Sequence, residues 1–119
     1  MPLTNCFCIR ITTRTGGIIA SMEWDTVVED GEKMPGAKWF GGSRLNFAEN
    51  LLRYRDEQAA LVFLGEEGTR RSMSYARMYE QVARIASSLR ELGLQTGDRV
   101  VAFMPNLPET VLAMLAAAS

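Results

Sequence analysis

Side chains that carry acid–base and nucleophilic chemistry are few in this sequence. None of its 119 residues is histidine, which removes Ser-His and Cys-His nucleophile pairs, histidine proton transfer and histidine-ligated metal sites. Its two cysteines, Cys6 and Cys8, lie too close in sequence for an unstrained disulfide and are too few for a zinc site. They are typical of reduced thiols in a cytosolic chain.

The carboxylates are dispersed rather than paired. Glu29, Asp30 and Glu32 surround a glycine, and Glu66 and Glu67 lie between two others. Solvated turns explain both groups better than an acid–base pair does. The sequence therefore offers no catalytic dyad.

The sequence gives little support for a phosphate-binding site. The segment RTGGIIAS has adjacent glycines but lacks the Gly-Lys-Ser/Thr of a phosphate loop, and EEGTRRS is better explained as a hairpin turn. Arg70 and Arg71 would point to opposite faces of a strand, which weakens a joint phosphate site. Asp98 is expected to be a turn residue. We predict no catalytic, cofactor-binding or metal-ligating residue in this segment.

The charge balance and apolar content limit the partners. A net charge of −1 with 23% charged residues gives no electrostatic reason to expect nucleic acid or an anionic membrane as a partner. No run approaches the roughly 18 to 20 apolar residues of a membrane helix. Residues 1–22 contain Arg10 and Arg14 and no acid, which is typical of an organelle-targeting leader or of an irregular start without an addressing role.

The elements that position these residues follow from the apolar pattern. Residues up to 22 show no clean period and are predicted to be irregular, and residues 23–45 form a loop-rich passage with several glycines. Trp24, Trp39 and Phe40 are expected to anchor this passage onto a neighbouring surface.

Regular elements are predicted downstream. Helical spacing indicates a helix within residues 45–55. An apolar arm, 60–64, and a shorter second arm, 70–73, predict a hairpin around a turn at 65–68. Ser74 is expected to cap the next helix through its hydroxyl. The apolar stripe of that helix comprises Tyr75, Met78, Tyr79, Val82, Ile85, Ala86, Leu89 and Leu92.

The last third of the chain predicts a helix end, a strand and a further helix. Gly93 is placed to end the long helix with a positive φ. Residues 99–104 are nearly continuously apolar, which predicts a strand buried on both faces. Pro108 and Glu109 favour the first turn of a final helix.

The final strand and helix lack partners within the sequence. Leu112, Met114 and Leu115 are expected to have nothing to cover them, and the parallel strand that completes such a unit is missing. Each large side chain left in water forgoes roughly 1.5–3 kcal/mol, against roughly 5–15 kcal/mol of stability for a small domain. The sequence therefore predicts an incomplete α/β fold with the order helix, β-hairpin, helix, buried strand, helix.

The stretch PGAKWFGGSRLNFAENLLR resembles the N-terminal segment of acetoacetyl-CoA synthetases, which are short-chain members of the adenylate-forming acyl-CoA ligase superfamily. The shared motifs are Trp39-Phe40, Gly42-Ser43-Arg44-Leu45-Asn46 and Ala48-Glu49-Asn50-Leu51-Leu52-Arg53. The resemblance continues through GDRVV and MPN and covers residues 17–119. RLNFAENLLR favours the acetoacetyl branch over the acetyl and propionyl branches.

This resemblance implies a domain plan and a reaction. Residues 1–16 would be an atypical start, 17–56 the acyl-CoA synthetase N-terminal segment, and 57–119 the beginning of the AMP-binding (adenylation) domain. The family is cytosolic. In its reaction the carboxylate of acetoacetate attacks the α-phosphate of ATP and releases pyrophosphate, with Mg²⁺ assisting, and the CoA thiol then displaces AMP.

The resemblance also implies that the catalytic motifs lie downstream of Ser119. The segment alone is expected to be inactive, with the remainder of the ligase chain as its partner. A few motif residues are expected to pack the arm onto the large domain, with contact of Arg44 to CoA or to a neighbouring domain as an alternative: Trp39, Phe40, Arg44, Asn46 and Asn50. Alternatives for the whole chain are an acetyl- or propionyl-CoA ligase fragment and a non-catalytic interaction module.

Overall fold

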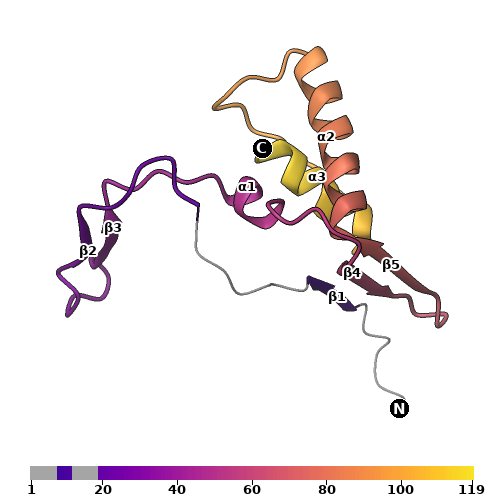
Figure 1. Ribbon diagram of the computed structural model, residues 1–119, viewed down its shortest axis with the longest axis horizontal. Coiled ribbons are helices and arrows are strands. Elements are labelled where there is room, and N and C mark those ends of the chain that lie inside the picture. Colours follow the sequence, from indigo (N-terminus) through magenta and orange to yellow (C-terminus); the bar gives the residue numbers. More distant parts are fainter. Residues whose placement is uncertain (1–7, 12–18) are drawn as a thin grey trace.

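A computed structural model describes residues 8–11 and 19–119 and combines short strands with helices (Figure 1). Within these residues the strands form two antiparallel sheets, one with the order β1-β4-β5 and one formed by β2 and β3. The mixed helix and strand composition confirms the α/β class. The elements are β1 (Cys8–Ile11), β2 (Thr26–Glu29), β3 (Lys38–Gly41), α1 (Phe47–Leu51), β4 (Ala59–Leu64), β5 (Arg70–Ser74), α2 (Tyr75–Glu91) and α3 (Pro108–Ala117).

The β4–β5 hairpin confirms the sequence prediction. Its turn is closed by the Gly65 N–H, which donates to the Thr69 carbonyl at 2.8 Å, and by the Gly68 N–H, which donates to the Gly65 carbonyl at 3.0 Å. Leu61 and Phe63 of β4 are buried, as alternation on a half-covered strand requires. One sheet face therefore meets the helices.

β1 corrects the prediction that the first 22 residues are irregular. Ile9 of β1 is paired with Phe63 of β4 in an antiparallel ladder. The strand is only four residues long, and its paired residues lie fifty or more positions away. A short strand whose hydrogen bonds all go to distant residues leaves little periodic signal in the sequence.

Helix α2 begins and ends at the predicted residues. The Ser74 hydroxyl accepts from the Arg77 N–H at 3.3 Å, which satisfies one of the free amides of the first turn. At the other end Gly93 has φ +93°, a conformation that a side chain would strain, and its N–H donates to the Arg90 carbonyl at 2.9 Å. Local sequence therefore fixes both ends of the helix.

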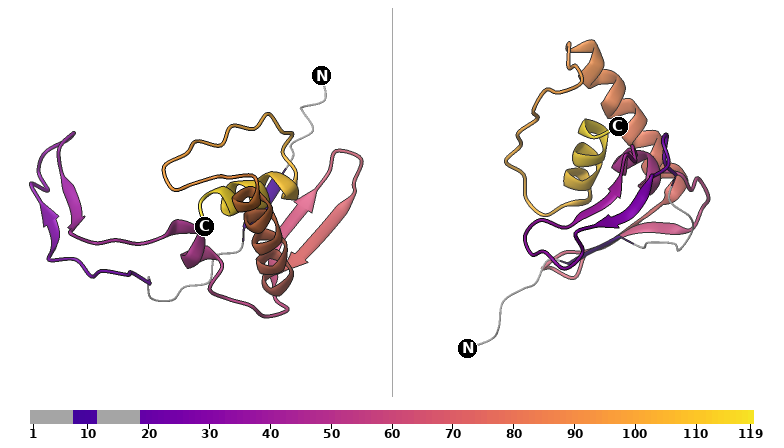
Figure 2. Two further views of the ribbon diagram at one scale, coloured as in Figure 1. Left: turned by 90° about the horizontal axis from the view of Figure 1, so that it is seen from above. Right: turned by 90° about the vertical axis from the view of Figure 1, so that its left-hand side faces the viewer.

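The last helix, α3, packs against α2 in every view (Figures 1 and 2). Leu112 and Leu115 are only 2% and 1% exposed, so the expectation that they lack cover is wrong. The reason is that α2 and α1 reach them, and only Met114 of the three stays open, at 49% exposure. The start of α3 matches the prediction, with Pro108 in its first turn.

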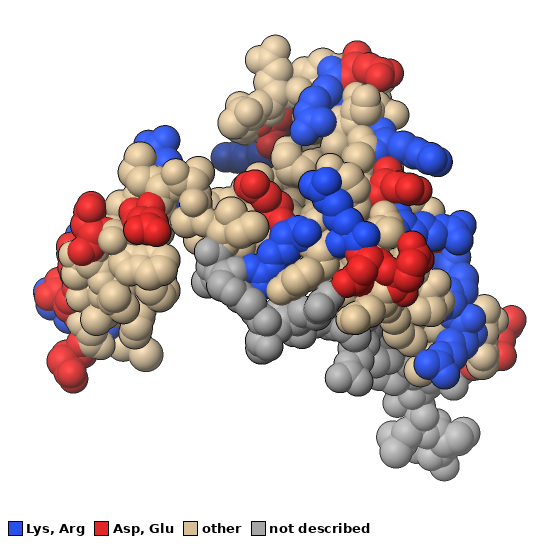
Figure 3. Space-filling model, in the orientation of Figure 1, with Lys and Arg blue, Asp and Glu red and all other residues tan. Residues whose placement is uncertain are grey.

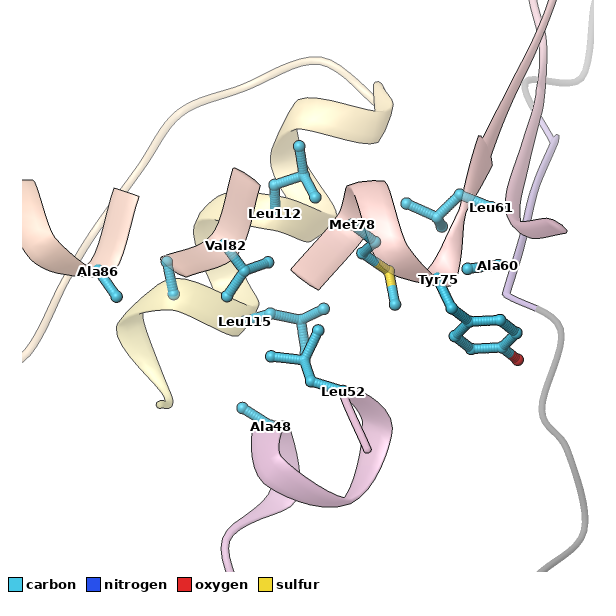
Figure 4. Close-up of a cluster of buried hydrophobic side chains, with 11 residues drawn as sticks. Ala48, Leu52, Ala60, Leu61, Tyr75, Met78, Val82, Ala86, Leu112 and Leu115 are labelled. Carbon is cyan, nitrogen blue, oxygen red and sulfur yellow. The ribbon is translucent and has the colours of Figure 1, made fainter. Parts of the chain in front are cut away.

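A single cluster of apolar side chains joins the helices to the sheet (Figure 4). α1 contributes its inward face, α2 contributes its stripe, and α3 and β4 close the two sides. The buried members are Ala48, Leu52, Ala60, Leu61, Tyr75, Met78, Val82, Ala86, Leu112, Leu115 and Ala116.

Residues 99–104 correct the prediction of a buried strand. They form no ladder with the rest of the described chain, and they lie in a loop that bows away from α2 and α3 (Figure 2). Val101 and Phe103 are 93% and 107% exposed. An apolar run becomes a strand only where neighbouring strands accept its hydrogen bonds, and the described residues supply none.

The segment before β4 contains a hairpin that was not predicted and a helix that is shorter than predicted. Within residues 23–45, β2 and β3 form a small hairpin in which Val28 is paired with Trp39. The helix predicted within residues 45–55 is limited to Phe47–Leu51, and Leu45 lies outside it and half exposed. In Figure 1 the β2–β3 hairpin stands apart from the helices.

Candidate functional site

The described residues assemble no obvious catalytic centre. Over residues 8–11 and 19–119, no three His, Cys, Asp or Glu side chains are grouped so that they hold a metal ion. In the same residues we find no helix with the length and apolar character needed to cross a membrane. The face shown in Figure 3 mixes both charge signs over the helices and the sheet.

Arg44 acts through its backbone. Its N–H donates to the Met22 carbonyl at 3.1 Å, and its own carbonyl accepts from the Ser21 N–H at 2.8 Å and the Ser21 hydroxyl at 3.0 Å. The Arg44 side chain is exposed and has no hydrogen bond or ion pair with other described residues. Its contact with CoA or a neighbouring domain stays a prediction.

Asn46 joins the start of one helix to the end of another. Its Oδ1 accepts from the Glu49 N–H at 3.0 Å, which caps α1, and its Nδ2 donates to the Ala118 carbonyl at 2.9 Å. Ala118 is the C-cap of α3 and lies 72 positions away. One carboxamide thus satisfies an unpaired amide of α1 and a free carbonyl of α3.

Asn50 binds the backbone of the incoming segment. Its Oδ1 accepts from the Ile19 N–H at 2.8 Å, and its Nδ2 donates to the Ile19 carbonyl at 2.7 Å. The same Nδ2 also donates to the Asn46 carbonyl at 2.9 Å. The side chain therefore pairs with Ile19 as a neighbouring strand would, and it fixes that pairing to α1.

The Trp-Phe part of the motif packs within its own hairpin. The Phe40 ring lies edge-on to Trp24 with centroids 5.2 Å apart and is tilted against Trp39 at 6.5 Å. Trp39 remains 62% exposed, so its expected anchoring onto a neighbouring surface is not seen within the described residues and stays a prediction. The rings stay open because no other described element lies near this hairpin (Figure 1).

Gly42 is required at the base of the β2–β3 hairpin. Its φ is +82°, and a Cβ added there would lie 2.6 Å from Oδ2 of Asp25. The conformation disfavours any residue with a side chain, and an added Cβ would also have to displace the Asp25 carboxylate. The glycine of the Gly-Ser-Arg-Leu-Asn motif is thereby explained by the hairpin geometry.

A charged contact joins β5 to α3. Nη1 and Nη2 of Arg71 donate to the two oxygens of the Glu109 carboxylate at 3.0 Å, and the Arg71 guanidinium lies over the Phe63 ring at 5.2 Å. The hydrogen bonds from Arg71 lower the pKa of Glu109 below its ordinary value. Arg71 is thus engaged within the fold, which weakens the phosphate-site interpretation further.

The two glycine-containing segments have different outcomes. EEGTRRS forms the turn and second strand of the β4–β5 hairpin, as predicted. RTGGIIAS lies mostly outside the described residues. Asp98 holds a turn, since its Oδ2 accepts from the Gln95 N–H at 2.8 Å. A hollow of about 700 Å³ beside this turn is open to solvent and is lined by the end of α2, residues 94–98, residues 116–119 and Asn46.

Asn46 and Asn50 carry contacts that the sequence interpretation did not specify. One of them had a usable local signal. Asn46 followed three residues later by Glu49 is an N-terminal capping pattern ahead of an apolar helix. The bonds from Asn46 to Ala118 and from Asn50 to Ile19 had none, because they depend on how distant segments pack.

Comparison with known proteins defines the class. Residues 47–119 match the family described as AMP-binding enzyme. The match covers more than half of the chain, so the chain belongs to this family of adenylate-forming enzymes.

Within the family the chain is similar to acetoacetyl-CoA synthetases. The protein from Rattus norvegicus is 40% identical over 106 residues, which are 87% of this chain and 16% of the relative, and that from Rhizobium meliloti is 46% identical over 90 residues, which are 76% and 14%. The solved acetoacetyl-CoA synthetase from Streptomyces lividans aligns with a TM-score of 0.71 at 40% identity, covering 85% of this chain and 16% of that one. An acetyl-coenzyme A synthetase from Chlorobaculum tepidum is 39% identical over 101 residues, which are 81% of this chain and 15% of that relative.

The chain spans about one sixth of the length of these relatives. The likeness to the S. lividans structure confirms the expected kinship of this fold with part of an adenylate-forming ligase. The division of the chain at residue 57 stays a prediction.

Proposed function

We propose that this chain is the N-terminal portion of an acetoacetate–CoA ligase. In the proposed reaction the acetoacetate carboxylate attacks the α-phosphate of ATP, pyrophosphate leaves, and the CoA thiol then displaces AMP to give acetoacetyl-CoA. Family membership supports the use of ATP and CoA, and Mg²⁺ is proposed as the ion that accompanies ATP. The observation that carries the proposal is the match of this chain to one sixth of the S. lividans synthetase with a shared fold.

The role proposed for residues 1–119 is structural. The RLNFAEN segment joins three parts of the chain through backbone and carboxamide hydrogen bonds, which supports this role. The domain plan of residues 1–16, 17–56 and 57–119 and a cytosolic location are parts of the proposal. Location is testable by imaging a fluorescent fusion of the whole protein.

The proposed partner of this segment is the remainder of the ligase chain. Support comes from residues 99–104, where Val101 and Phe103 face solvent on a backbone that pairs with no strand among the described residues. Such a segment gains both hydrogen bonds and apolar burial when neighbouring strands are added. A parallel strand of the longer chain would supply them.

The test is reconstitution from two chains. Residues 1–119 are mixed with the part of the S. lividans synthetase that follows its matched segment, and acetoacetate-dependent AMP release is measured. Neither chain alone should turn over, and the mixture should. The matched control splits the S. lividans protein at the same position. Turnover by residues 1–119 alone, or an inactive mixture beside an active control pair, would contradict the proposal.

An acetyl-CoA ligase is the second candidate, because the C. tepidum relative is nearly as similar as the rat protein. The RLNFAENLLR motif favours acetoacetate. The complete product of the transcript that contains this sequence should be assayed with acetoacetate, acetate and propionate at equal concentrations. A higher kcat/KM for acetate than for acetoacetate would reassign the substrate and leave the ligase class intact.

A further inference from the structure

Two asparagines on one side of α1 form a continuous polar connection through the chain. Ile19, Asn50, Asn46 and Ala118 follow one another in space, linked by carboxamide hydrogen bonds of 2.7 to 2.9 Å. The two outer partners lie 31 and 72 positions from the asparagines that bind them. The connection therefore spans the incoming segment and the end of the last helix.

We propose that Asn46 and Asn50 are positioning residues that lock the segment at Ile19 to the C-terminal end of α3 through α1. The apolar cluster alone does not set this arrangement. Ala48 and Leu52 fill the cluster from the inner face of α1, but apolar contacts are non-directional. Hydrogen bonds from a carboxamide fix distance and angle, so they define where Ile19 and Ala118 sit relative to α1.

The lock requires an amide rather than any polar group. Asn50 uses Oδ1 as an acceptor and Nδ2 as a double donor, and Asn46 uses one of each. A carboxylate keeps the acceptor and loses every donor. Aspartate therefore separates the functions of Asn46, because it caps a helix as well as asparagine does but offers no hydrogen to Ala118.

The inference rests on the geometry of this chain and is independent of ligase activity. The experiment measures amide hydrogen exchange of residues 1–119 by NMR. The Ile19 and Glu49 amides report directly, because they donate to the asparagine side chains. The Ala118 amide reports on the last turn of α3, which Asn46 holds through the Ala118 carbonyl. Loss of one hydrogen bond should speed exchange roughly twofold to tenfold.

Asn46→Asp should speed exchange at Ala118 and leave Glu49 protected, whereas Asn46→Ala should speed both. The matched control is Asn106→Asp, the same chemical change at an exposed asparagine with no side-chain hydrogen bond to other described residues. It should leave both amides unchanged. Equal exchange at Ala118 in Asn46→Asp and in the unsubstituted chain would overturn the role of Asn46.

Asn50→Ala tests the connection between the two asparagines. It should speed exchange at Ile19 and, through the lost bond to the Asn46 carbonyl, also raise exchange at Ala118 by a smaller factor. An effect confined to Ile19 would show two separate contacts and overturn the lock. Unprotected Ile19 in the unsubstituted chain would overturn it as well.

Discussion

The two apolar segments that close the chain lie in opposite environments. Helix α3 buries Leu112 and Leu115 against α2, whereas residues 99–104, just before it, leave Val101 and Phe103 in solvent. Both were expected to lack partners. The difference lies in the backbone rather than in the side chains.

A helix satisfies its own backbone and needs only a surface for its apolar face, which α2 and α1 provide. A strand has no internal hydrogen bonds, so burying it without neighbouring strands would leave each N–H and C=O unpaired at a cost of about 1–3 kcal/mol each. Residues 99–104 therefore stay hydrated although they are as apolar as the helix. The segment is apolar enough to lie in a hydrophobic core, but the described residues contain no sheet that it joins.

The largest effect is expected when neighbouring strands are supplied to residues 99–104. In a chimera, residues 1–119 replace the matched segment of the S. lividans synthetase, and Phe103→Ala is introduced. If neighbouring strands cover Phe103 there, truncation should lower the free energy of unfolding by about 3–5 kcal/mol. Urea denaturation followed by circular dichroism measures the loss. A chimera indifferent to Phe103→Ala would contradict the proposed partner of this segment.

In the 119-residue chain Leu112→Ala should lower stability more than Phe103→Ala does. Leu112→Ala removes a side chain that is 2% exposed, and it should lower stability by about 2–5 kcal/mol. Phe103→Ala should change it by no more than about 0.5 kcal/mol, because nothing packs on that ring. Urea midpoints of the two variants provide the measurement. Equal shifts would show that residues 99–104 are buried after all.

A similar contrast separates two glycines with positive φ. Gly42→Ala meets Asp25 Oδ2 at 2.6 Å, whereas Gly68→Ala, at φ +77°, meets nothing within 4 Å. Both pay the left-handed strain of about 1–2 kcal/mol, and only the first must also displace a side chain. Amide exchange in β2–β3 should rise more for Gly42→Ala than exchange in β4–β5 rises for Gly68→Ala. Equal increases would remove the steric reason for the motif glycine.

The same division explains what the sequence could predict. The Ser74 cap, the end of α2 at Gly93 and the turn at Gly65 depend on residues a few positions apart, and all three were predicted. β1 was missed because each of its partners is a residue of β4. Contacts between residues close in sequence can be predicted from the sequence, whereas pairing between distant segments cannot.

The motif segment shows a second limit of prediction from the sequence. Resemblance identified Asn46 and Asn50 as structural residues before their contacts were known, but it gave no partner for either. Their partners, Ala118 and Ile19, are backbone groups, which leave no residue-type signal. The prediction of a strand at residues 99–104 was wrong for a physical reason. Its apolar pattern is typical of a strand inside a sheet, and the described residues contain no neighbouring strand for it.

A smaller effect is expected at the cap of α2. Ser74→Ala removes the hydroxyl that accepts from the Arg77 N–H and should lower stability by about 1 kcal/mol. Ser87→Ala, on the exposed side of the same helix, is the control for changing a serine to alanine. The difference in urea midpoint between the two variants measures the cap. A cap variant as stable as the unsubstituted chain would place the start of α2 under control of packing alone.

The smallest effect concerns the ion pair that attaches α3 to β5. The pKa of Glu109 is lowered by its hydrogen bonds to Arg71, so the pair stabilises the fold above the ordinary pKa of a glutamate and loses that contribution as the pH falls through the lowered value. Both side chains are about half exposed, which limits the contribution at neutral pH to about 0.2–1 kcal/mol. Glu109→Gln should therefore reduce stability at neutral pH and approach the unsubstituted chain in acid.

The control for this ion pair is Glu66→Gln, which neutralises an exposed carboxylate at the β4–β5 turn. Urea midpoints at neutral and acidic pH give the two differences, and only the one for Glu109 should shrink on acidification. A deficit of Glu109→Gln that persists at low pH would mean that the ionised carboxylate is not what holds α3 to the sheet. The attachment of α3 would then rest on packing against α2, which is the feature that distinguishes it from residues 99–104.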